Sequence, residues 1–549
     1  MGHKELDAKI KELPYKGGWR FGDDRRCLPG TREDFLDHII SWVENRGSQR
    51  GLVLLGQAGT GKSSIAHEVA RRFENKNLGS YFAFLRKEGS RDEAHQLFTT
   101  LARDLSNRYP PFKLALGRVL KNDPSLCSTR HYRTLFQRLL LEPAKCLQLE
   151  DPIFIVVDAL DESGDVIRQH GLHKFLADHL FELPSNFRIL ITSRPENGIE
   201  DVFGNTLSVR TLYMDDPKLA AKTEQDIRLY LENELPLDLF ERHGVKLAKA
   251  AEGLFQWAAV ACGLINRPPP SFGFSRKQVI RRLLGHSRDR DGQDPLDQLY
   301  REVLEGYFNP VAAQTLFRSI MGQLFAAVEP LSIRSLTILR QHAPKDDPED
   351  PDPEDCDCVV EMLRHLGSLL LNVTSSDDTL PIVPLHTSFR DFLASERSGV
   401  FHIDLGRSHR RLAHSCLGLM LNNLKFNICK LESSYLANRD VPDLESRIAK
   451  YLPPALSYAC VFWGDHLERL DIEQDLFPQL RSLFETRFLF WLEVLSIKSS
   501  VGLASRALAS LITWLRSAQR KVGASYHVIR HIVTIEYNCR NHPNQRLRI

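Results

Sequence analysis

The stretch Gly56-Gln57-Ala58-Gly59-Thr60-Gly61-Lys62-Ser63 follows the apolar run Leu52 to Leu55 and precedes a segment with helical spacing. It is a complete G-x-x-x-x-G-K-[ST] pattern, and a strand before it and a helix after it are the setting of a phosphate-binding loop. Glycines let the loop bend so that successive backbone N–H groups point at a β-phosphate, an approach that a Cβ atom would block. Lys62 is expected to reach the β- and γ-phosphates, and the Ser63 hydroxyl is placed for Mg²⁺. The predicted nucleotide-binding set is Gly56, Gln57, Ala58, Gly59, Thr60, Gly61, Lys62, Ser63 and Ser64.

Short apolar runs alternate with helical patterns between residues 27 and 213. The runs are Leu52–Leu55, Tyr81–Leu85, Ile153–Val157, Phe187–Thr192 and Leu207–Leu212. This alternation predicts an α/β domain with a parallel sheet and helices on both faces, the fold of P-loop NTPases. In such sheets ligands bind at the carboxyl ends of the strands, which is where the polar motifs of this chain begin.

Acidic residues follow the third of these runs. Asp158 ends the strand and is expected to hold Mg²⁺ through water, because a metal-binding acid belongs near the point where the triphosphate emerges from the loop. Asp161 and Glu162 lie one turn further on, where a carboxylate can orient and deprotonate an attacking water. The plain alternative is a strand that ends in exposed acids without a catalytic role.

Arg194 ends the next apolar run and precedes Pro195. A guanidinium at this position is expected to face the γ-phosphate, since arginine pairs with phosphate oxygens through two hydrogen bonds. That contact would vanish when the γ-phosphate leaves, which suits a nucleotide sensor as well as a catalyst. The alternative is a surface arginine.

Composition indicates an ordinary globular chain. Its 549 residues are 42% hydrophobic, which is enough for three or four packed domains. Because 72 Lys and Arg balance 70 acidic residues, no global charge draws the chain to nucleic acid or an anionic membrane. Ten cysteines without paired spacing favour a reducing compartment, and we expect a cytoplasmic protein. No signal peptide begins the sequence, and no apolar run approaches the ~20 residues of a membrane span.

The remaining chain is predominantly helical in pattern. We predict an N-terminal connector over 1–26, the nucleotide-binding domain over 27–213, a helical domain over 214–308, a winged-helix domain over 309–403 and a C-terminal helical domain over 404–549. The third of these rests on apolar helical spacing in Glu224–Leu235 and Val245–Ile265. The winged helix rests on a helix over Val359–Leu371 and two short strands, Leu371–Val373 and Ile382–Val383. It offers no dense Lys and Arg face, so no nucleic-acid partner is expected.

Five motifs in this order resemble a known family. The loop, DALDE at residues 158–162, ITSRPE at 191–196, GLFQWA at 253–258 and LHTSFRDFL at 385–393 look like a NACHT-type NTPase of the STAND class, in its fungal, nephrocystin-like branch. The resemblance implies that the lead-in segment Cys27–Arg32 helps to enclose the nucleotide base, which adds Arg32 to the binding set. It also implies that His386 reaches the β-phosphate of bound ADP in a resting state. Two positions depart from the family pattern, because Phe255 replaces a proline that packs on the base and Thr387 replaces an aspartate after the histidine.

The function that this resemblance implies is a signalling switch operated by ATP and ADP. The helical and winged-helix domains are expected to fold over bound ADP. Exchange of ADP for ATP is expected to release these domains, so that the protein self-associates or assembles with related proteins. The process implied is non-self recognition or programmed cell death. The loop pattern does not choose between ATP and GTP, and the resemblance favours ATP. We recognise no effector domain before residue 20 and no repeat array or propeller signature after the helices, so trigger and output are not visible in this sequence. A truncated gene product, a fragment and a regulator that joins intact relatives are the readings left open. A constitutive ATPase that remodels a client and a catalytically idle scaffold remain alternatives.

Overall fold

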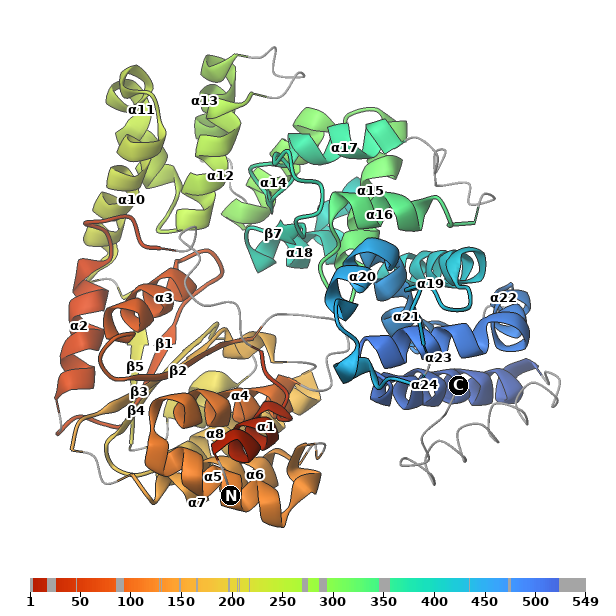
Figure 1. The fold of residues 1–549 in the computed structure, drawn as a ribbon. Coiled ribbons are helices and arrows are strands. Elements are labelled where there is room, and N and C mark those ends of the chain that lie inside the picture. The colour runs from red at the N-terminus through yellow and green to blue at the C-terminus, as the bar shows by residue number, and fades with distance from the viewer. Residues whose placement is uncertain are drawn as a thin grey trace. The chain divides into compact units, whose positions relative to one another are not determined.

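The computed structural model of this chain describes residues 3–16, 26–45, 47–84, 93–127, 129, 131–147, 150–163, 166–195, 198–204, 206, 208–216, 218–268, 275–285, 294–344, 356–433, 435–471 and 475–522. The chain divides into two units. The first comprises Met1–Pro268 and Ser275–Leu299, and the second comprises Tyr300–Ile549 with Pro269–Phe274. Each unit is described by itself below (Figure 1).

A five-stranded parallel sheet organises the first unit. Its strands are β1 (Gly51–Leu55), β2 (Leu78–Ala83), β3 (Ile153–Asp158), β4 (Phe187–Ser193) and β5 (Val209–Tyr213), in the spatial order β2-β3-β4-β1-β5. The register aligns Leu55 with Ser193 and Tyr213, and Ala83 with Asp158, so the carboxyl ends meet at one edge. The five predicted strands and their parallel arrangement are confirmed, with described ends that differ by up to three residues, whereas the predicted end residues Leu85 and Leu207 lie outside the described residues.

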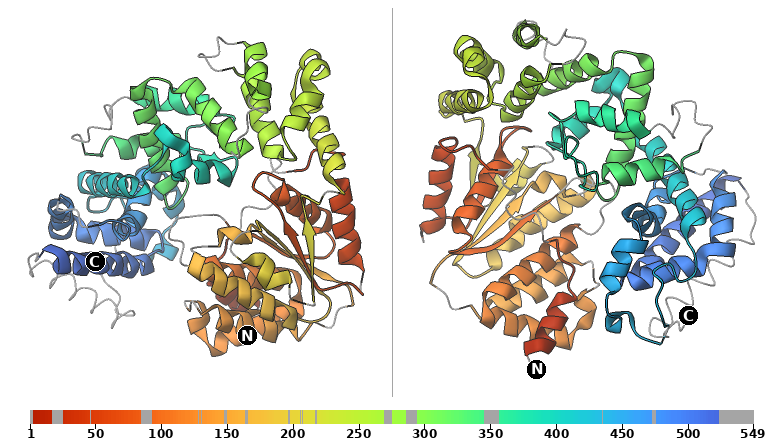
Figure 2. Two further views of the ribbon diagram at one scale, coloured as in Figure 1. Left: turned by 180° about the vertical axis from the view of Figure 1, so that it is seen from behind. Right: turned by 45° about the horizontal axis from the view of Figure 1, so that its top comes forward.

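Helices cover both faces of this sheet, as Figure 2 shows. One face packs on α2 (Glu33–Glu44) and α3 (Lys62–Phe73) through a core that contains Leu52, Leu54, Phe154 and Val156. The other packs on helices from the rest of the domain through Val53, Leu55, Ile155 and Val157. Those helices are α1 (His3–Lys11), α4 (Glu93–Arg108), α5 (Pro110–Asn122), α6 (Tyr132–Leu135), α7 (Glu142–Ala144), α8 (Val166–His179) and α9 (Ile199–Gly204). Successive strand residues thus enter opposite cores, which is why the strands are apolar without interruption.

The N-terminal segment is held on this domain by its own contacts. Leu6, Ile10 and Leu13 are buried in the core that contains α4 and α5. The Tyr15 hydroxyl donates to the buried Asp104 carboxylate at 2.9 Å. The described part of the predicted connector therefore packs as part of the nucleotide-binding domain, and its residues 17–25 lie outside the described residues.

A helical segment follows the sheet. It contains α10 (Ala220–Glu234), α11 (Leu237–Ala250), α12 (Phe255–Asn266), α13 (Arg276–Gly285) and the start of α14 (Pro295–Tyr307). The apolar spacing over 245–265 is divided between α11 and α12, because Glu252 and Gly253 adopt positive φ angles of 48° and 84° and end the first helix. This break brings the amino end of α12 to the phosphate-binding loop.

The second unit is mostly helical. Its helices are the remainder of α14, α15 (Val311–Ala326), α16 (Ile333–Arg340), α17 (Cys356–His365), α18 (Thr387–Ala394), α19 (Leu405–Asn423), α20 (Leu444–Tyr451), α21 (Pro454–Leu467), α22 (Leu476–Ser482), α23 (Phe488–Ile497) and α24 (Gly502–Val522). A two-stranded antiparallel sheet joins β6 (Leu370–Leu371) and β7 (Val383–Pro384). Helix α17 ends at His365, five residues before β6, where the sequence suggested a helix to Leu371. The winged-helix assignment stays a prediction. Among the described helices, none has the length and apolar character needed to cross a membrane.

Candidate nucleotide-binding site

The loop between β1 and α3 has the backbone that its glycines predict. Gly59 and Gly61 adopt φ angles of 80° and 93°, a left-handed region that costs other residues energy. Helix α3 begins directly after Gly61, so its first N–H groups and its positive dipole end face the loop. A helix amino terminus of this kind is suited to a phosphate group.

Lys62 is buried against this loop. Its Nζ donates to the carbonyls of Gly56 at 2.7 Å and Gln57 at 2.9 Å. The pKa of Lys62 is lowered to about 8, chiefly by burial and also by nearby Arg194, while Asp161, Asp158 and Glu162 oppose this shift. The electrostatic influence of these four side chains shows that the fold brings the predicted loop, acids and arginine together at one edge of the sheet.

Asp158 accepts hydrogen bonds from three hydroxyl groups. Its Oδ1 is 3.1 Å from Ser63 Oγ and also accepts from Thr192, and its Oδ2 is 3.1 Å from the Tyr81 hydroxyl. Ser63 comes from the start of α3, whereas Tyr81 and Thr192 come from the strands on either side of β3. A hydroxyl and a carboxylate at this distance are hard oxygen donors, the type that Mg²⁺ prefers. The pair Ser63 and Asp158 therefore fits a magnesium ion held with a bound triphosphate, and its role as a metal site stays a prediction.

The acidic turn after β3 is tied to the end of β4. In the 3-10 turn η4 (Leu160–Glu162), Asp161 pairs with Arg194, with Nε and Oδ2 3.1 Å apart. Asp161 also accepts from the Arg194 backbone N–H at 3.1 Å. Buried His173 of α8 lies 3.2 Å from the Leu160 carbonyl and supports the turn from behind. Arg194 and Asp161 thus hold each other, and Glu162, which is 8% exposed, is the second acid of the turn.

Arg32 has contacts that the sequence did not reveal. Its guanidinium donates to the Thr60 carbonyl at 2.7 Å and to Thr223 Oγ1 at 2.8 Å, and it lies 4.7 Å from the centroid of the Phe255 ring. Its backbone N–H donates to Asp226 at 2.9 Å. Burial lowers the pKa of Arg32 to about 10, and Asp226 opposes that shift. Arg32 therefore joins the phosphate-binding loop to α10 and α12, and its predicted contact with a nucleotide base stays a prediction.

A second contact joins the loop to the helical segment directly. The Gln256 backbone N–H, in the first turn of α12, donates to the Gly59 carbonyl at 3.1 Å. A Cβ atom built on Gly59 would lie 2.8 Å from the Gln256 Cβ and 3.1 Å from the Leu296 Cδ1. The equivalent atom on Gly61 would meet nothing within 4 Å. The loop thus touches the helical segment at Gly59 and faces open space at Gly61.

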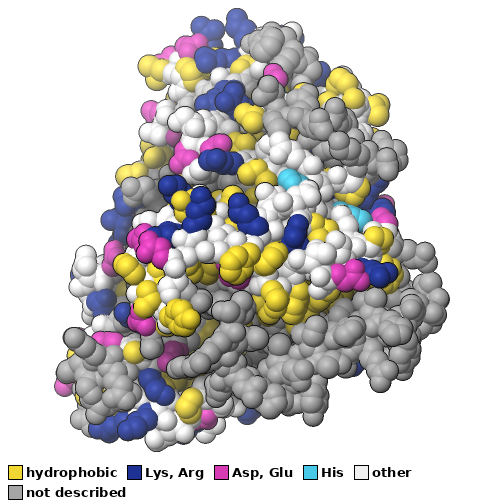
Figure 3. Space-filling model, turned by 45° about the vertical axis from the view of Figure 1, so that its right-hand side comes forward, with side chains coloured by type: hydrophobic (Ala, Val, Ile, Leu, Met, Phe, Trp, Pro, Cys, Tyr) yellow, Lys and Arg dark blue, Asp and Glu magenta, His cyan; other side chains and the backbone are white. Residues whose placement is uncertain are grey.

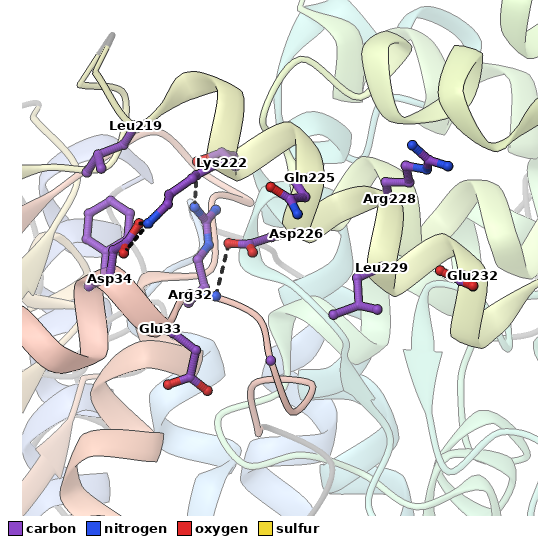
Figure 4. A pocket seen from close by; sticks show the side chains of 13 residues that line it. Arg32, Glu33, Asp34, Leu219, Lys222, Gln225, Asp226, Arg228, Leu229 and Glu232 are labelled. Atoms are coloured by element: carbon purple, nitrogen blue, oxygen red, sulfur yellow. Dashed lines mark hydrogen bonds and ion pairs between the residues drawn. The ribbon is translucent and has the colours of Figure 1, made fainter.

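A pocket of about 380 Å³ adjoins Arg32. It lies between the start of α2 and α10, and its charged lining includes Glu33, Asp34, Lys222 and Asp226. Figure 4 shows Arg32 directed to α10 between these residues, with Lys222 turned toward Asp34. None of the loop residues 56–63 is among the lining residues of this pocket, and Arg32, which lines it, donates to the Thr60 carbonyl of the loop.

His386 lies in the second unit, just before α18. Its Nδ1 accepts from the Ser388 backbone N–H at 3.1 Å and so caps that helix. The Ser388 hydroxyl lies 2.8 Å from the Tyr300 hydroxyl. His386 therefore has a structural task within its own unit, and its predicted contact with a β-phosphate stays a prediction.

The sequence alone missed several residues of this site. Tyr81, Thr223 and Asp226 lie outside the motifs, and Thr192 and Gln256 lie within ITSRPE and GLFQWA without any sign there of their contacts. On the face drawn in Figure 3, described Lys and Arg side chains lie in small groups among acidic, hydrophobic and neutral ones.

Residues 30–194 match the family model described as Nephrocystin 3, N-terminal. No curated protein matches the chain significantly.

Solved structures show distant similarity. The Signal Transduction ATPase with Numerous Domains (STAND) protein with a tetratricopeptide repeat sensor from Pyrococcus horikoshii is similar over 98% of this chain and 77% of its own, at 16% identity and a TM-score of 0.40. The Aeropyrum pernix ORC1 protein, solved in complex with DNA, is similar over 67% of this chain and 94% of its own, at 16% identity and a TM-score of 0.28. Cdc6p from Pyrobaculum aerophilum is similar over 72% of this chain and 97% of its own, at 13% identity and a TM-score of 0.28. The loop, the parallel sheet and the family match together show that the chain contains a P-loop nucleotide-binding domain, of which residues 30–194 are similar to the N-terminal part of nephrocystin 3.

Proposed function

We propose that this protein is a switch operated by ATP and ADP, in which the state of the phosphate-binding loop sets the position of the helical segment. One observation carries this proposal. Two consecutive loop carbonyls, those of Gly59 and Thr60, are bonded to Gln256 of α12 and to Arg32, which in turn bonds α10. Any movement of the loop that accompanies gain or loss of a γ-phosphate must therefore strain or break contacts of the helical segment.

The site residues have distinct roles in this proposal. Lys62 and the first N–H groups of α3 bind the β- and γ-phosphates. Ser63 and Asp158 hold Mg²⁺, which when bound neutralises charge on the phosphates. Glu162 is the base that orients and deprotonates water for slow hydrolysis, and Asp161 keeps Arg194 aimed at the γ-phosphate position.

The contact energies are of the size that a switch needs. Moving a two-state population from 1:99 to 99:1 takes about 5.5 kcal/mol of differential binding. A hydrogen bond that involves a charged group contributes about 1.5–3 kcal/mol, so the two guanidinium bonds of Arg32 amount to about 3–6 kcal/mol. These two bonds therefore supply a large part of the required difference, and the Gln256–Gly59 backbone bond adds about 0.5–1.5 kcal/mol to it.

The wider role follows the motifs of the sequence. We propose that the ADP state is closed, with His386 of the second unit contributing to the closure, and that the ATP state permits self-association or assembly with related NACHT-type proteins inside the cell. The signal transmitted belongs to the non-self recognition or cell-death class that the resemblance implies.

Nucleotide analysis tests the proposal. The purified chain is denatured, and the released nucleotide is identified and counted against standards, beside the matched variant Lys62→Ala. Near-equimolar ADP from the wild type, none from Lys62→Ala, and little turnover of added ATP are expected. An empty protein that hydrolyses ATP rapidly would instead mean a constitutive ATPase. A protein that binds no nucleotide would mean a scaffold.

A further inference from the structure

Tyr81 lies on β2, next to the strand that carries Asp158. Its register partner on β3 is Val156, and Ala83 pairs with Asp158. Side chains two residues apart on a strand share a face, so Tyr81, Val156 and Asp158 lie on the same side of the sheet. Two residues advance a strand by about 6.6 Å, a distance that a tyrosine leaning along its strand can span. The Tyr81 hydroxyl accordingly lies 3.1 Å from Asp158 Oδ2.

The ring of Tyr81 is fixed by its surroundings. It is 7% exposed, and the His67 ring packs edge-on against it, with centroids 5.8 Å apart. His67 lies one turn after Ser63 on α3, so the helix that presents Ser63 to Asp158 also presents the ring that holds Tyr81. The phenol is therefore a preorganised donor to one particular carboxylate oxygen.

Asp158 is 3% exposed, and its side chain accepts hydrogen bonds from one hydroxyl on each neighbouring strand and from Ser63. Thr192 of β4 and Ser63 donate to Oδ1, and Tyr81 donates to Oδ2. Ser63 is itself a magnesium donor in the proposed function, whereas Thr192 and Tyr81 sit on strands. The two strand hydroxyls fix the plane of the carboxylate whether or not Ser63 turns to a metal.

We propose that Tyr81 is a positioning residue for Mg²⁺. Tyr81 acts by orienting the Asp158 carboxylate and not through contact with the nucleotide. This inference rests on the proposed function, because it assigns Mg²⁺ to Asp158. Removal of a hydrogen bond that orients a metal ligand weakens metal affinity about 10–100-fold. Tyr81→Phe keeps the ring and its packing on His67 and deletes only the oxygen. Tyr81→Phe should leave the affinity for metal-free ATP unchanged. It should lower the Mg²⁺ ratio, which is the ATP affinity with Mg²⁺ divided by the ATP affinity without it, by about tenfold or more.

Calorimetric titration of the full chain with ATP, once in excess Mg²⁺ and once in EDTA, measures this ratio without any turnover. Tyr15→Phe is the matched control, since it deletes the hydroxyl that donates to Asp104, a buried carboxylate of the same domain. Its ratio of affinities with and without Mg²⁺ should equal that of the wild type. Tyr81→Met, which keeps apolar volume without a hydroxyl, gives a second variant with the same expectation should Tyr81→Phe fold poorly. Thermal unfolding verifies the fold of each.

A double-mutant cycle with Asp158→Asn shows whether Tyr81 acts through that carboxylate. The effect of Tyr81→Phe on the Mg²⁺ ratio should disappear in the Asp158→Asn background. An unchanged Mg²⁺ ratio in both Tyr81 variants overturns the inference, as does an effect of Tyr81→Phe that persists without the carboxylate. A wild type that binds ATP equally with and without Mg²⁺ overturns it too, yet leaves the switch intact. A wild type that binds no ATP at all overturns the proposed function itself.

Discussion

Alanine at Gly59 should disturb the helical segment, whereas alanine at Gly61 should not. Both glycines adopt left-handed backbone angles in the same loop. Only at Gly59 would the new methyl group meet the helical segment, 2.8 Å from the Gln256 Cβ and 3.1 Å from the Leu296 Cδ1. Carbon atoms are at their best separation at about 3.5–4.0 Å, so the segment must move or the loop must distort.

The magnitude follows from two separate costs. A non-glycine residue in the left-handed region costs about 1–2 kcal/mol, and both variants bear this cost. Overpacking against a well-filled contact costs about 1–3 kcal/mol more, and only Gly59→Ala bears it. We therefore expect Gly59→Ala to destabilise the nucleotide-free protein by about 2–5 kcal/mol and Gly61→Ala by about 1–2 kcal/mol.

Hydrogen exchange of nucleotide-free protein localises the difference. The Gln256 amide is protected by its bond to the Gly59 carbonyl, so its exchange reports whether α12 stays on the loop. Each 1.4 kcal/mol lost from this contact speeds exchange about tenfold. Gly59→Ala should accelerate the Gln256 amide by about one to two powers of ten, and Gly61→Ala should leave it near the wild-type rate. Equal rates in the two variants would refute the claim that the loop and α12 are mechanically joined at Gly59.

Three further perturbations have distinct expected outcomes. Arg32→Lys keeps the positive charge but loses the planar guanidinium that bonds both the Thr60 carbonyl and Thr223. Because these bonds join the loop to α10 in the closed ADP state, release of a fluorescent ADP should accelerate about tenfold or more in a displacement assay. Because burial lowers the pKa of Lys62 to about 8, nucleotide-free protein loses this charge as pH rises through 8. ADP affinity measured by calorimetry should then fall about tenfold from pH 7.5 to 9. An ADP affinity that does not change with pH would contradict the assignment of Lys62 to the phosphates. The same shift makes unfolding of the nucleotide-free protein harder as pH rises from 8 to 10.5, because the unfolded chain then binds more protons. Glu162→Gln should retain ATP and lower its turnover about 100-fold or more, whereas wild-type turnover in both Glu162→Gln and Asp161→Asn would exclude both acids as the base.

The sheet and the loop were predictable because their signals are local. A strand buried on both faces must be apolar without interruption, and the run Phe154 to Val157 has no other good explanation. The loop pattern fixes the backbone at Gly59 and Gly61 through their lack of a Cβ atom. The acids after β3 then fall at the right edge because parallel strands share one direction.

The contacts around the loop were not predictable, since they join residues far apart in sequence. Arg32 and Thr223 are 191 positions apart, and nothing in either neighbourhood signals the other. In the sequence, Tyr81 is an ordinary aromatic residue of a strand. Its position near Asp158 becomes clear only from the β2–β3 register, in which Tyr81 pairs with Val156. Helical spacing over 245–265 also concealed the break at Gly253, because the apolar spacing continues from α11 into α12.

Hydrogen exchange with each nucleotide tests the switch most directly. The full-length Glu162→Gln variant is compared with saturating ADP and with saturating ATP, both with Mg²⁺, and amides are followed along α10 and the first turn of α12. We expect slower exchange with ADP than with ATP at Gln256 and around Thr223 to Asp226, by about tenfold or more for a contact of 1.4 kcal/mol or more. Identical protection of both helices in the two nucleotide states would contradict the proposed switch, even if both nucleotides bind tightly.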